Sequence, residues 1–523
     1  KTILFTTLMI LSFTVQSQNT FLKTFGGDRS DEMHRMIRSH DGGFIMVGNT
    51  QSYGQGNFGL SDDYIVKTDS TGQILWSRTL GLQDYDDIYW IEATQDSGYV
   101  ICGIATDNNT YIGILLAKIS ESGNVVWQKV MEQDHAGMGY CVRQTTDGGL
   151  IVAAEILQDD NLDFLLIKTD ENGNIQWSKQ VGSLEPDIPG YILQTADGGY
   201  LAFGTTRQNS ATIPLYAVKT DNSGNVQWQK TYNTSPLFSR SSVSNLIATG
   251  DGGFLVAANN THNQLFSDII LMKIDSNGNS QWIKSFGGDQ DEFCGSMLQK
   301  SDGNLVICGS SSSSEAYNAD GLVLLIDTFG NLIQSSLFGT ANADDAFISI
   351  LPLADGGFML GGSTSSFNEF LYGDFMMMRM DKDFNGPSCF TLTPNIATND
   401  VFFADTSDFS ESDVNVSGND VFAVIDSGVK DSVLCGIATG EELPPPDKNV
   451  LSLYPNPAST QLTFSGNYDD IAEMEIYNDL GIKISSAPFS QYMNVAAVTA
   501  GYYFIRFLND DNEVIGTAHF IKH

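Results

Sequence analysis

Hydrophobic residues occur along most of the chain in short runs that alternate with turns rich in glycine and aspartate. The run Phe44-Ile45-Met46-Val47, directly after Asp41-Gly42-Gly43, is representative. Short apolar runs bounded by turn residues predict β-strands, because a strand crosses a small core with fewer residues than a helix. No long segment has apolar residues at helical spacing, so the pattern predicts an all-β protein.

A turn of the form Asp-Gly-Gly-aromatic recurs through most of the sequence. Its seven copies, with departures such as Ser97 and Asn304, begin about 50 to 55 residues apart at Asp41, Asp96, Asp147, Asp197, Asp251, Asp302 and Asp355. Glycine supplies the positive φ that tight hairpin turns require. A regular period of this length is typical of the blades of a β-propeller.

A second element, Lys-x-Asp-x-x-Gly-x-x-x-Trp, follows four of these turns and ends at Trp76, Trp177, Trp228 and Trp282. The second repeat has Ser120 in place of the aspartate and leads to Trp127. Each repeat therefore offers four antiparallel strands, as a propeller blade requires. The lysine and the aspartate of this motif lie on the same strand face, so we expect them to form a structural ion pair.

The ends of the repeat region predict how the propeller is completed. The segment from Phe21 to Asp28 matches the segment from Trp282 to Asp289, which is a fourth strand, and no first three strands precede it. We therefore expect a seven-bladed propeller over residues 18–386 in which the N-terminal strand completes the last blade. The tryptophan and Asp-Gly-Gly motifs resemble those of quinoprotein-like propellers and of uncharacterised propellers of bacterial surface proteins.

Charge and the N-terminal segment indicate where the protein works. The sequence holds 63 acidic and 26 basic residues, and no segment clusters enough lysine or arginine to bind nucleic acid. Lys1, the apolar run from Ile3 to Val15 and then Ser17 predict a signal peptide over residues 1–17. No other apolar stretch is long enough for a transmembrane helix, so none is expected.

The last part of the chain departs from the repeat. Residues 387–440 predict a small β extension, and a proline-rich linker follows at 441–448. Residues 449–523 contain Tyr454-Pro455-Asn456-Pro457, a turn at Gly481, Gly501-Tyr502 and the near-terminal Lys522. These motifs resemble the type A sorting domain of type IX secretion, found in Gram-negative Bacteroidota. The resemblance implies a β-sandwich that is recognised by an outer-membrane translocon with its shuttle and sortase proteins, and a passenger at the cell surface or released.

The six cysteines lie in three pairs along the chain. Cys389 and Cys435 bracket the β extension, and we predict a disulfide between them. Cys294 and Cys308 fall on consecutive strands of one repeat, where a cross-strand disulfide is an alternative to free thiols. Cys102 and Cys141 are expected to be buried thiols.

The candidate ligand site lies in the loops that lead from the fourth strand of one blade to the first strand of the next. These loops carry Asp28 and Asp31, then Asp84, Tyr85, Asp87 and Trp90, and later Asp289 and Asp291. Carboxylates and aromatic rings together can bind a sugar or a divalent cation. The alternative interpretation is that these acidic residues have no ligand and only keep the loop edge of the propeller hydrated. No cofactor or metal is predicted, with calcium as the alternative, because the histidines lack ligand spacing and the turns lack a calcium-binding glutamate.

The predicted function is that of a secreted or surface-attached, non-catalytic propeller that binds a glycan or a protein through its loop face. The alternatives are an extracellular hydrolase or lyase acting on polysaccharide, and a structural or adhesin component. An active site should break the repeat symmetry in one place, whereas the motifs above recur in nearly every blade. A glycosidase would also need two carboxylates at a defined separation, which a sequence does not supply.

Overall fold

The computed structural model divides the chain into two compact units, Lys1–Ile437 and Ala438–His523, which are described separately. The first unit is described over residues 20–392 apart from 54–60, 82–85, 108–109, 133–136, 159–160, 184, 208–212, 233–239, 263–265, 314–317, 341–342, 368–371 and 391, and then as short strands between 397 and 436. The second unit is described at 452–454, 461–465, 471–478, 483–490, 492–495, 501–509 and 514–522. The predicted signal peptide (1–17) and linker (441–448) lie outside the described residues.

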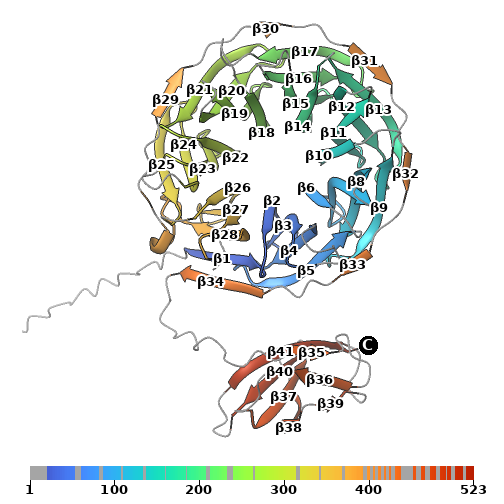
Figure 1. The fold of residues 1–523 in the computed structure, drawn as a ribbon, viewed down its shortest axis with the longest axis vertical. Helices are drawn as coiled ribbons and strands as arrows, with labels where there is room; N and C mark the ends of the chain where they lie inside the picture. The colour runs from blue at the N-terminus through green and yellow to red at the C-terminus, as the bar shows by residue number, and fades with distance from the viewer. Residues whose placement is uncertain are drawn as a thin grey trace, which may run out of the picture. The chain divides into compact units, whose positions relative to one another are not determined.

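The repeats form seven antiparallel sheets of four strands, which Figure 1 shows arranged about a common centre. Sheets 1 to 4 comprise β2 (Asp31–Arg38), β3 (Phe44–Thr50), β4 (Asp62–Thr68) and β5 (Ile74–Gly81); β6 (Asp87–Ala93), β7 (Gly98–Asp107), β8 (Thr110–Ser120) and β9 (Val125–Glu132); β10 (Gly137–Gln144), β11 (Leu150–Gln158), β12 (Asn161–Thr169) and β13 (Ile175–Gly182); and β14 (Asp187–Gln194), β15 (Tyr200–Thr206), β16 (Leu215–Thr220) and β17 (Val226–Tyr232). Sheets 5 to 7 comprise β18 (Arg240–Ala248), β19 (Phe254–His262), β20 (Phe266–Ile274) and β21 (Ser280–Gly287); β22 (Glu292–Gln299), β23 (Leu305–Ser311), β24 (Asp320–Ile326) and β25 (Leu332–Phe338); and β26 (Asp345–Pro352), β27 (Phe358–Thr364), β28 (Asp374–Met380) and β1 (Phe21–Gly26). This arrangement fits a seven-bladed propeller.

The N-terminal strand belongs to the last sheet, as the sequence predicts. β1 pairs antiparallel with β28, with Leu22 opposite Met378. The innermost strand of each sheet contacts the innermost strand of the next, and β2 of sheet 1 contacts β26 and β27 of sheet 7. The first and last repeats are therefore neighbours.

Neighbouring sheets pack through a glycine in a turn and an aromatic ring. The turn glycine of the Lys-x-Asp-x-x-Gly motif has a positive φ, 83° at Gly224. A Cβ placed on Gly224 would lie 2.9 Å from the Trp177 ring of the preceding sheet. Equivalent contacts join Trp76 to Gly123, Trp127 to Gly173, Trp228 to Gly278 and Trp282 to Gly330. Glycine thus serves the turn conformation and the packing of the next sheet together.

The seventh repeat departs from this pattern on both sides of the contact. Phe384 stands at the glycine position with φ 65°, a conformation that costs a bulky residue roughly 1 kcal/mol or more. In the preceding repeat the tryptophan position holds Gln334, which is exposed. The large ring has moved from the strand to the turn, and Phe384 instead packs against Phe358 at 5.2 Å between ring centroids.

The expected lysine ion pair is present, but its partner is a different aspartate. Lys219 contacts Asp197 of the Asp-Gly-Gly turn at 2.8 Å, and not Asp221 of its own motif. Asp221 instead accepts hydrogen bonds from the backbone N–H groups of Ser223 and Asn225 and shapes its own turn. In four other repeats the lysine likewise forms an ion pair with the aspartate of the Asp-Gly-Gly turn: Lys67 with Asp41, Lys118 with Asp96, Lys168 with Asp147 and Lys273 with Asp251. The prediction chose the wrong partner because the strand pairing brings the Asp-Gly-Gly turn next to the lysine.

The short strands described between residues 397 and 436, which we call the outer belt, pair with the outer edges of the sheets and do not form a separate extension. The belt strands are β29 (Ala397–Asp400), β30 (Asp405–Thr406), β31 (Ser410–Asp413), β32 (Ser417–Asn419), β33 (Ala423–Ile425) and β34 (Lys430–Gly436). They pair in turn with the outermost strands β21, β17, β13, β9, β5 and β1. Leu392, after the 3-10 helix η1 (Ser388–Phe390), bridges Leu337 of sheet 6. The belt thus supplies hydrogen-bond partners to exposed sheet edges, which are otherwise prone to unwanted pairing.

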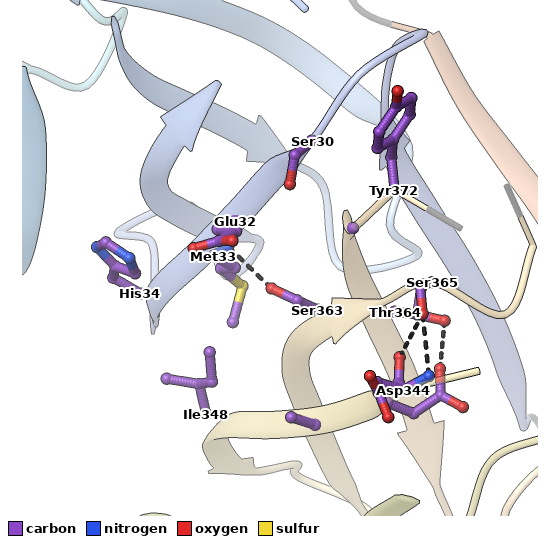
Figure 2. A pocket seen from close by; sticks show the side chains of 13 residues that line it. Ser30, Glu32, Met33, His34, Asp344, Ile348, Ser363, Thr364, Ser365 and Tyr372 are labelled. Atoms are coloured by element: carbon purple, nitrogen blue, oxygen red, sulfur yellow. Dashed lines mark hydrogen bonds between the residues drawn. The ribbon is translucent and has the colours of Figure 1, made fainter. Parts of the chain in front are cut away.

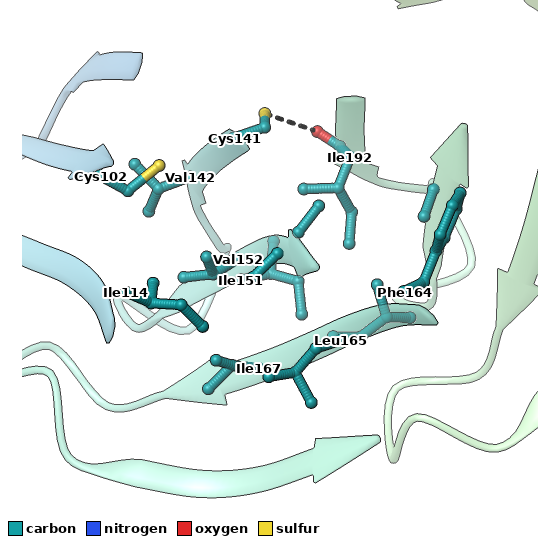
Figure 3. Close-up of a cluster of buried hydrophobic side chains, with 14 of the residues drawn as sticks. Cys102, Ile114, Cys141, Val142, Ile151, Val152, Phe164, Leu165, Ile167 and Ile192 are labelled. Carbon is teal, nitrogen blue, oxygen red and sulfur yellow. Dashed lines mark hydrogen bonds between the residues drawn. The ribbon is translucent and has the colours of Figure 1, made fainter. Parts of the chain in front are cut away.

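Four of the cysteines are buried free thiols, and one is disulfide-bonded. Cys102, Cys141, Cys294 and Cys308 are free and buried, so the cross-strand pair is wrong: a β-bulge sets Cys308 opposite Ser296 and Cys294 opposite Gly309. Figure 3 shows Cys102 and Cys141 among apolar side chains, with the Cys141 thiol donating to the Ile192 carbonyl at 3.8 Å. Cys389 is disulfide-bonded. The Cys435 side chain lies outside the described residues, so its pairing with Cys389 stays a prediction.

The second unit contains two small sheets. One comprises β35 (Ser452–Tyr454), β36 (Gln461–Ser465) and β39 (Tyr492–Asn494), and the other β38 (Lys483–Pro488), β37 (Glu473–Asn478), β40 (Gly501–Leu508) and β41 (Val514–Lys522). Leu462 of the first sheet and Ile505 of the second belong to one buried cluster. Of the predicted motif, Tyr454, Gly501, Tyr502 and Lys522 lie in strands, whereas Pro455, Asn456, Pro457 and Gly481 fall outside the described residues.

The lysine–aspartate pairs predict an asymmetric effect of substitution. In Asp197→Ala the buried Lys219 ammonium loses its carboxylate partner. We expect the free energy of unfolding to decrease by about 2 kcal/mol. In Lys219→Met the half-exposed Asp197 stays hydrated, and the loss should be below about 1 kcal/mol. Urea denaturation at pH 7 measures both. Equal losses, or a larger loss for Lys219→Met, would contradict this account of the turn.

Candidate functional site

Buried acids stand at the start of five of the innermost strands, in equivalent positions of the repeat. They are Asp31, Asp86, Asp187, Glu292 and Asp345, each with no exposed surface. Asp31 accepts hydrogen bonds from the Gly27 backbone and the Ser52 hydroxyl, both at 2.8 Å. Glu292 likewise accepts them from the Gly288 backbone and Ser311, both at 2.6 Å. These carboxyl groups hold the loop between consecutive sheets in place.

A second acid, from the third strand of the preceding sheet, faces each of them. The pairs are Asp374 with Asp31, Asp163 with Asp187, Asp268 with Glu292, and Asp320 with Asp345, and Asp62 holds the equivalent position for Asp86. A glycine ends the fourth strand between the two acids; a Cβ on Gly182 would lie 2.6 Å from the Asp187 carboxylate. In the two repeats without a pair, Glu132 and Asn233 replace this glycine. The sequence therefore keeps the two acids and the glycine together.

Burial changes the protonation of these acids. Burial, and then the neighbouring Asp163 charge, outweigh the hydrogen bonds from Thr206 and Ser183 and raise the pKa of Asp187 to about 7. Burial raises the pKa of Asp345 to about 6 despite hydrogen bonds from Thr364 and Ser366. At neutral pH part of these carboxyl groups therefore hold a proton, and the pairs carry less than one negative charge per acid.

The junction between sheets 1 and 2 departs from the acid pattern of the other repeats. Asp63 and Asp87 occur there in addition to the usual pair, and both are buried. The position of Asp63 holds Phe164, Ile269, Gly321 or Phe375 in other repeats. Neither Asp63 carboxyl oxygen has a hydrogen-bond partner, and burial with the charges of Asp86, Asp87 and Asp62 raises the pKa of Asp63 well above its usual range. Asp63 is thus a buried acid at a position that holds an apolar residue or glycine in the other repeats.

Asp87 connects this junction to an aromatic row on the innermost strands. His34 Nδ1 lies 3.1 Å from the Asp87 carboxylate, and Asn49 donates to it at 3.2 Å. Burial opposes a charge on His34, but Asp87 stabilises it and raises the His34 pKa above its ordinary value. The His34 ring stacks on Tyr89 at 5.3 Å, and Tyr89 stacks on Tyr140 at 5.9 Å.

A β-bulge in every innermost strand creates the row. The bulged residues are His34, Tyr89, Tyr140, Gly190, Ser244, Gly295 and Ile348. Rings therefore occupy three successive sheets, and mostly small residues occupy the other four. A bulge re-aims side chains, and here it aligns partly exposed rings on one side of the propeller axis.

A pocket of about 470 Å³ adjoins His34 between sheets 7 and 1. Its polar lining includes the hydroxyls of Ser30, Ser363, Ser365 and Tyr372 and the carboxylates of Glu32 and Asp344, while Met33 and Ile348 form its apolar part. Figure 2 shows Ser363 accepting the Met33 backbone N–H and Ser365 bonded to Asp344. The pocket and the aromatic row share His34, so together they form one candidate site.

The residues predicted from the sequence lie partly elsewhere. Asp31, Asp87 and Trp90 are buried, Asp28 and Asp289 are exposed, and Asp291 accepts the Ser267 backbone N–H at 2.7 Å. Asp28 and Asp31 lie at the junction of sheets 7 and 1, whereas Asp289 and Asp291 lie at that of sheets 5 and 6. Asp84 and Tyr85 fall outside the described residues. His34, Tyr140 and Asp63 were missed, although comparing equivalent repeat positions would have shown Asp63 as an acid among apolar residues.

Two features are absent from the described residues. No helix there has the length and apolar character needed to cross a membrane. No group of three or more His, Cys, Asp and Glu side chains there is placed to hold a metal ion.

Comparison with known proteins identifies the tail of the chain. Residues 452–522 match the family described as the secretion system C-terminal sorting domain. This domain is the export signal of type IX secretion, so it indicates export to the cell surface or the extracellular space and interaction with the type IX machinery. No curated protein matches the chain.

Solved structures with similar folds are distant. They include a protein of unknown function from Dyadobacter fermentans, 8% identical, covering 70% of this chain and 98% of that one with a TM-score of 0.41. A fungal alcohol oxidase in complex with copper is 8% identical, covering 97% and 99% with a TM-score of 0.38. Sqt1 from Chaetomium thermophilum is 8% identical, covering 70% and 99% with a TM-score of 0.37. Similarity at this level gives no information on activity.

The carboxyl pairs predict that stability decreases as the pH rises from about 4 through about 7. Because the folded pKa of Asp187 is about 7, above the value of about 3.9 in an unfolded chain, the folded protein binds more protons between these values. Its contribution to stability is complete below about pH 4 and is lost as pH rises through 7. We expect a lower thermal unfolding midpoint at pH 8 than at pH 5, with a smaller difference in Asp187→Asn. Asp170→Asn, in an exposed turn, is the control; identical pH profiles for wild type and Asp187→Asn would refute the assignment.

Proposed function

We propose that the protein is an exported, non-catalytic propeller that binds a glycan at the site formed by the pocket and the aromatic row. The observation that carries the proposal is the stacked row of His34, Tyr89 and Tyr140 beside a pocket lined by hydroxyls and carboxylates. Sugars present apolar ring faces that stack on aromatic side chains and hydroxyl groups that bond to such polar groups. The repeat symmetry is also broken at the adjoining junction of sheets 1 and 2, where Asp87 contacts His34.

The export signal supports an extracellular ligand. A propeller that carries a type IX sorting domain meets its ligand outside the cell, where polysaccharides are abundant. The loop acids Asp28, Asp84, Asp289 and Asp291, with Tyr85, belong to the proposal as contacts for a longer ligand that extends from the pocket. Calcium has no part in it.

Binding is tested with a glycan array probed by the full-length chain. We expect one glycan class to bind, and Tyr89→Ala and Tyr140→Ala each to weaken that binding about tenfold through lost ring stacking. Phe329→Ala removes an aromatic ring that is 74% exposed in a turn of sheet 6, and it should leave binding unchanged. An array without any bound glycan, or equal loss in all three variants, would reject the proposed site.

Export is tested by deleting residues 452–522 in a host that has type IX secretion. We expect the deletion to keep the protein inside the cell envelope, because the passenger has lost the domain that the translocon recognises. Immunoblots of cells and medium measure the distribution, and a fluorescent protein carrying residues 438–523 provides the reciprocal control. Release of the shortened chain at the wild-type level would exclude this route.

A further inference from the structure

Three sheets contribute side chains to a cation–π arrangement around Trp90, near the aromatic row. The Arg35 guanidinium carbon of β2 lies 3.4 Å from the centroid of the Trp90 ring on β6. The Arg143 guanidinium carbon of β10 lies 5.6 Å from the same ring. Arg35 also reaches Tyr191 of β14, with Nη1 3.5 Å from the hydroxyl oxygen, so its side chain crosses toward the fourth sheet.

The two arginines differ in their counter-ions. Arg143 forms an ion pair with Glu92 at 2.8 Å. Arg35, by contrast, forms no ion pair with any carboxylate in the described part of the chain. In a sequence with 63 acidic and 26 basic residues, a partly buried guanidinium without an acidic neighbour is unusual. The Arg35 guanidinium therefore lacks a counter-ion in the described part of the chain.

Two hydrogen-bond donors at this place also lack acceptors. Arg35 Nε and Trp90 Nε1 are both buried, and neither has a hydrogen-bond partner. Trp90 as a whole is only 3% exposed. A buried N–H group without an acceptor costs about 1–3 kcal/mol, so such groups commonly mark the position of a ligand atom or of water. Since these two N–H groups lie beside a positive charge without a counter-ion, the acceptor that suits them best is negatively charged.

We propose that Arg35 and Trp90 bind the carboxylate of an acidic sugar, so that the glycan ligand is a uronate-containing polysaccharide. A carboxylate offers two acceptor oxygens, which match the Nε–H groups of the guanidinium and of the indole. His34 and Tyr89 directly precede Arg35 and Trp90 in the sequence. The sugar rings would stack on the row that these two residues form with Tyr140. This inference rests on the proposed glycan binding and names its chemical class.

The test is calorimetric titration of the full-length chain with three probes: an oligogalacturonate, a neutral oligosaccharide of the same length, and a sulfated oligosaccharide. We expect the oligogalacturonate to bind, with an affinity that decreases as salt increases, and to bind at least about tenfold more tightly than the neutral probe. The sulfated probe separates carboxylate recognition from general attraction of anions.

Three variants assign the contact. Arg35→Gln removes the charge and should reduce oligogalacturonate affinity about tenfold or more, while Trp90→Phe keeps a smaller aromatic ring and removes the N–H together with part of the indole. We expect a smaller, several-fold loss for Trp90→Phe. Arg78→Gln, on the outer strand β5, is the matched control and should bind as wild type. Thermal unfolding midpoints show whether each variant is folded.

The outcomes separate this inference from the function on which it depends. Equal binding of neutral and uronate probes, unaffected by Arg35→Gln, overturns carboxylate recognition and leaves glycan binding intact. Tighter binding of the sulfated probe overturns the choice of carboxylate. If no probe binds at any salt concentration while the glycan array is positive, the carboxylate site is wrong; if the array is also negative, the proposed function fails with it.

Discussion

The structure depends on one constraint: each four-stranded sheet is apolar on both faces and needs a neighbour on each side. All residues of β3 and of β15 are buried, although each strand has side chains on both faces of its sheet. A single repeat therefore has no stable form in water, and the repeats stabilise one another. The contact that joins them is specific, because the tryptophan of one sheet needs a turn glycine without a Cβ in the next. Where the turn has Phe384, the tryptophan is absent as well.

Acids inside this arrangement have two different roles. The five carboxyl pairs recur with their glycine and bond to the loop backbone, so they belong to the scaffold. The extra acids Asp63 and Asp87 lie at one junction, and Asp87 contacts His34 of the aromatic row. Burial makes the first group stabilising only while it holds protons, whereas the turn aspartates that pair with lysine stabilise the protein as anions. Burial alone opposes ionisation of Asp197, yet Lys219 and Thr195 lower its pKa to about 2.

The sequence predicts the fold well because its signals are local. Asp-Gly-Gly turns, strand lengths and the fourth-strand match at Phe21 depend on neighbouring residues, so the number of sheets and the place of β1 followed from them. The outer belt escaped prediction because most of its strands have only two to four residues, and several, such as Ser417–Asn419, are polar. Its position depends on strand edges that other parts of the chain provide. The candidate site was only partly predicted, since one inserted residue per inner strand changes which side chains face the axis, as at His34 and Tyr140.

Sheet 7 combines the beginning of the described chain with two of its later parts. β1 lies between β28, from the last repeat, and β34, the final strand of the outer belt. Residues far apart in the order of synthesis must all be present before this sheet is complete. A chain without β34 leaves β1 with an unpaired edge, to which another strand can add. Sheet 7 is therefore complete only when all three parts of the chain are present.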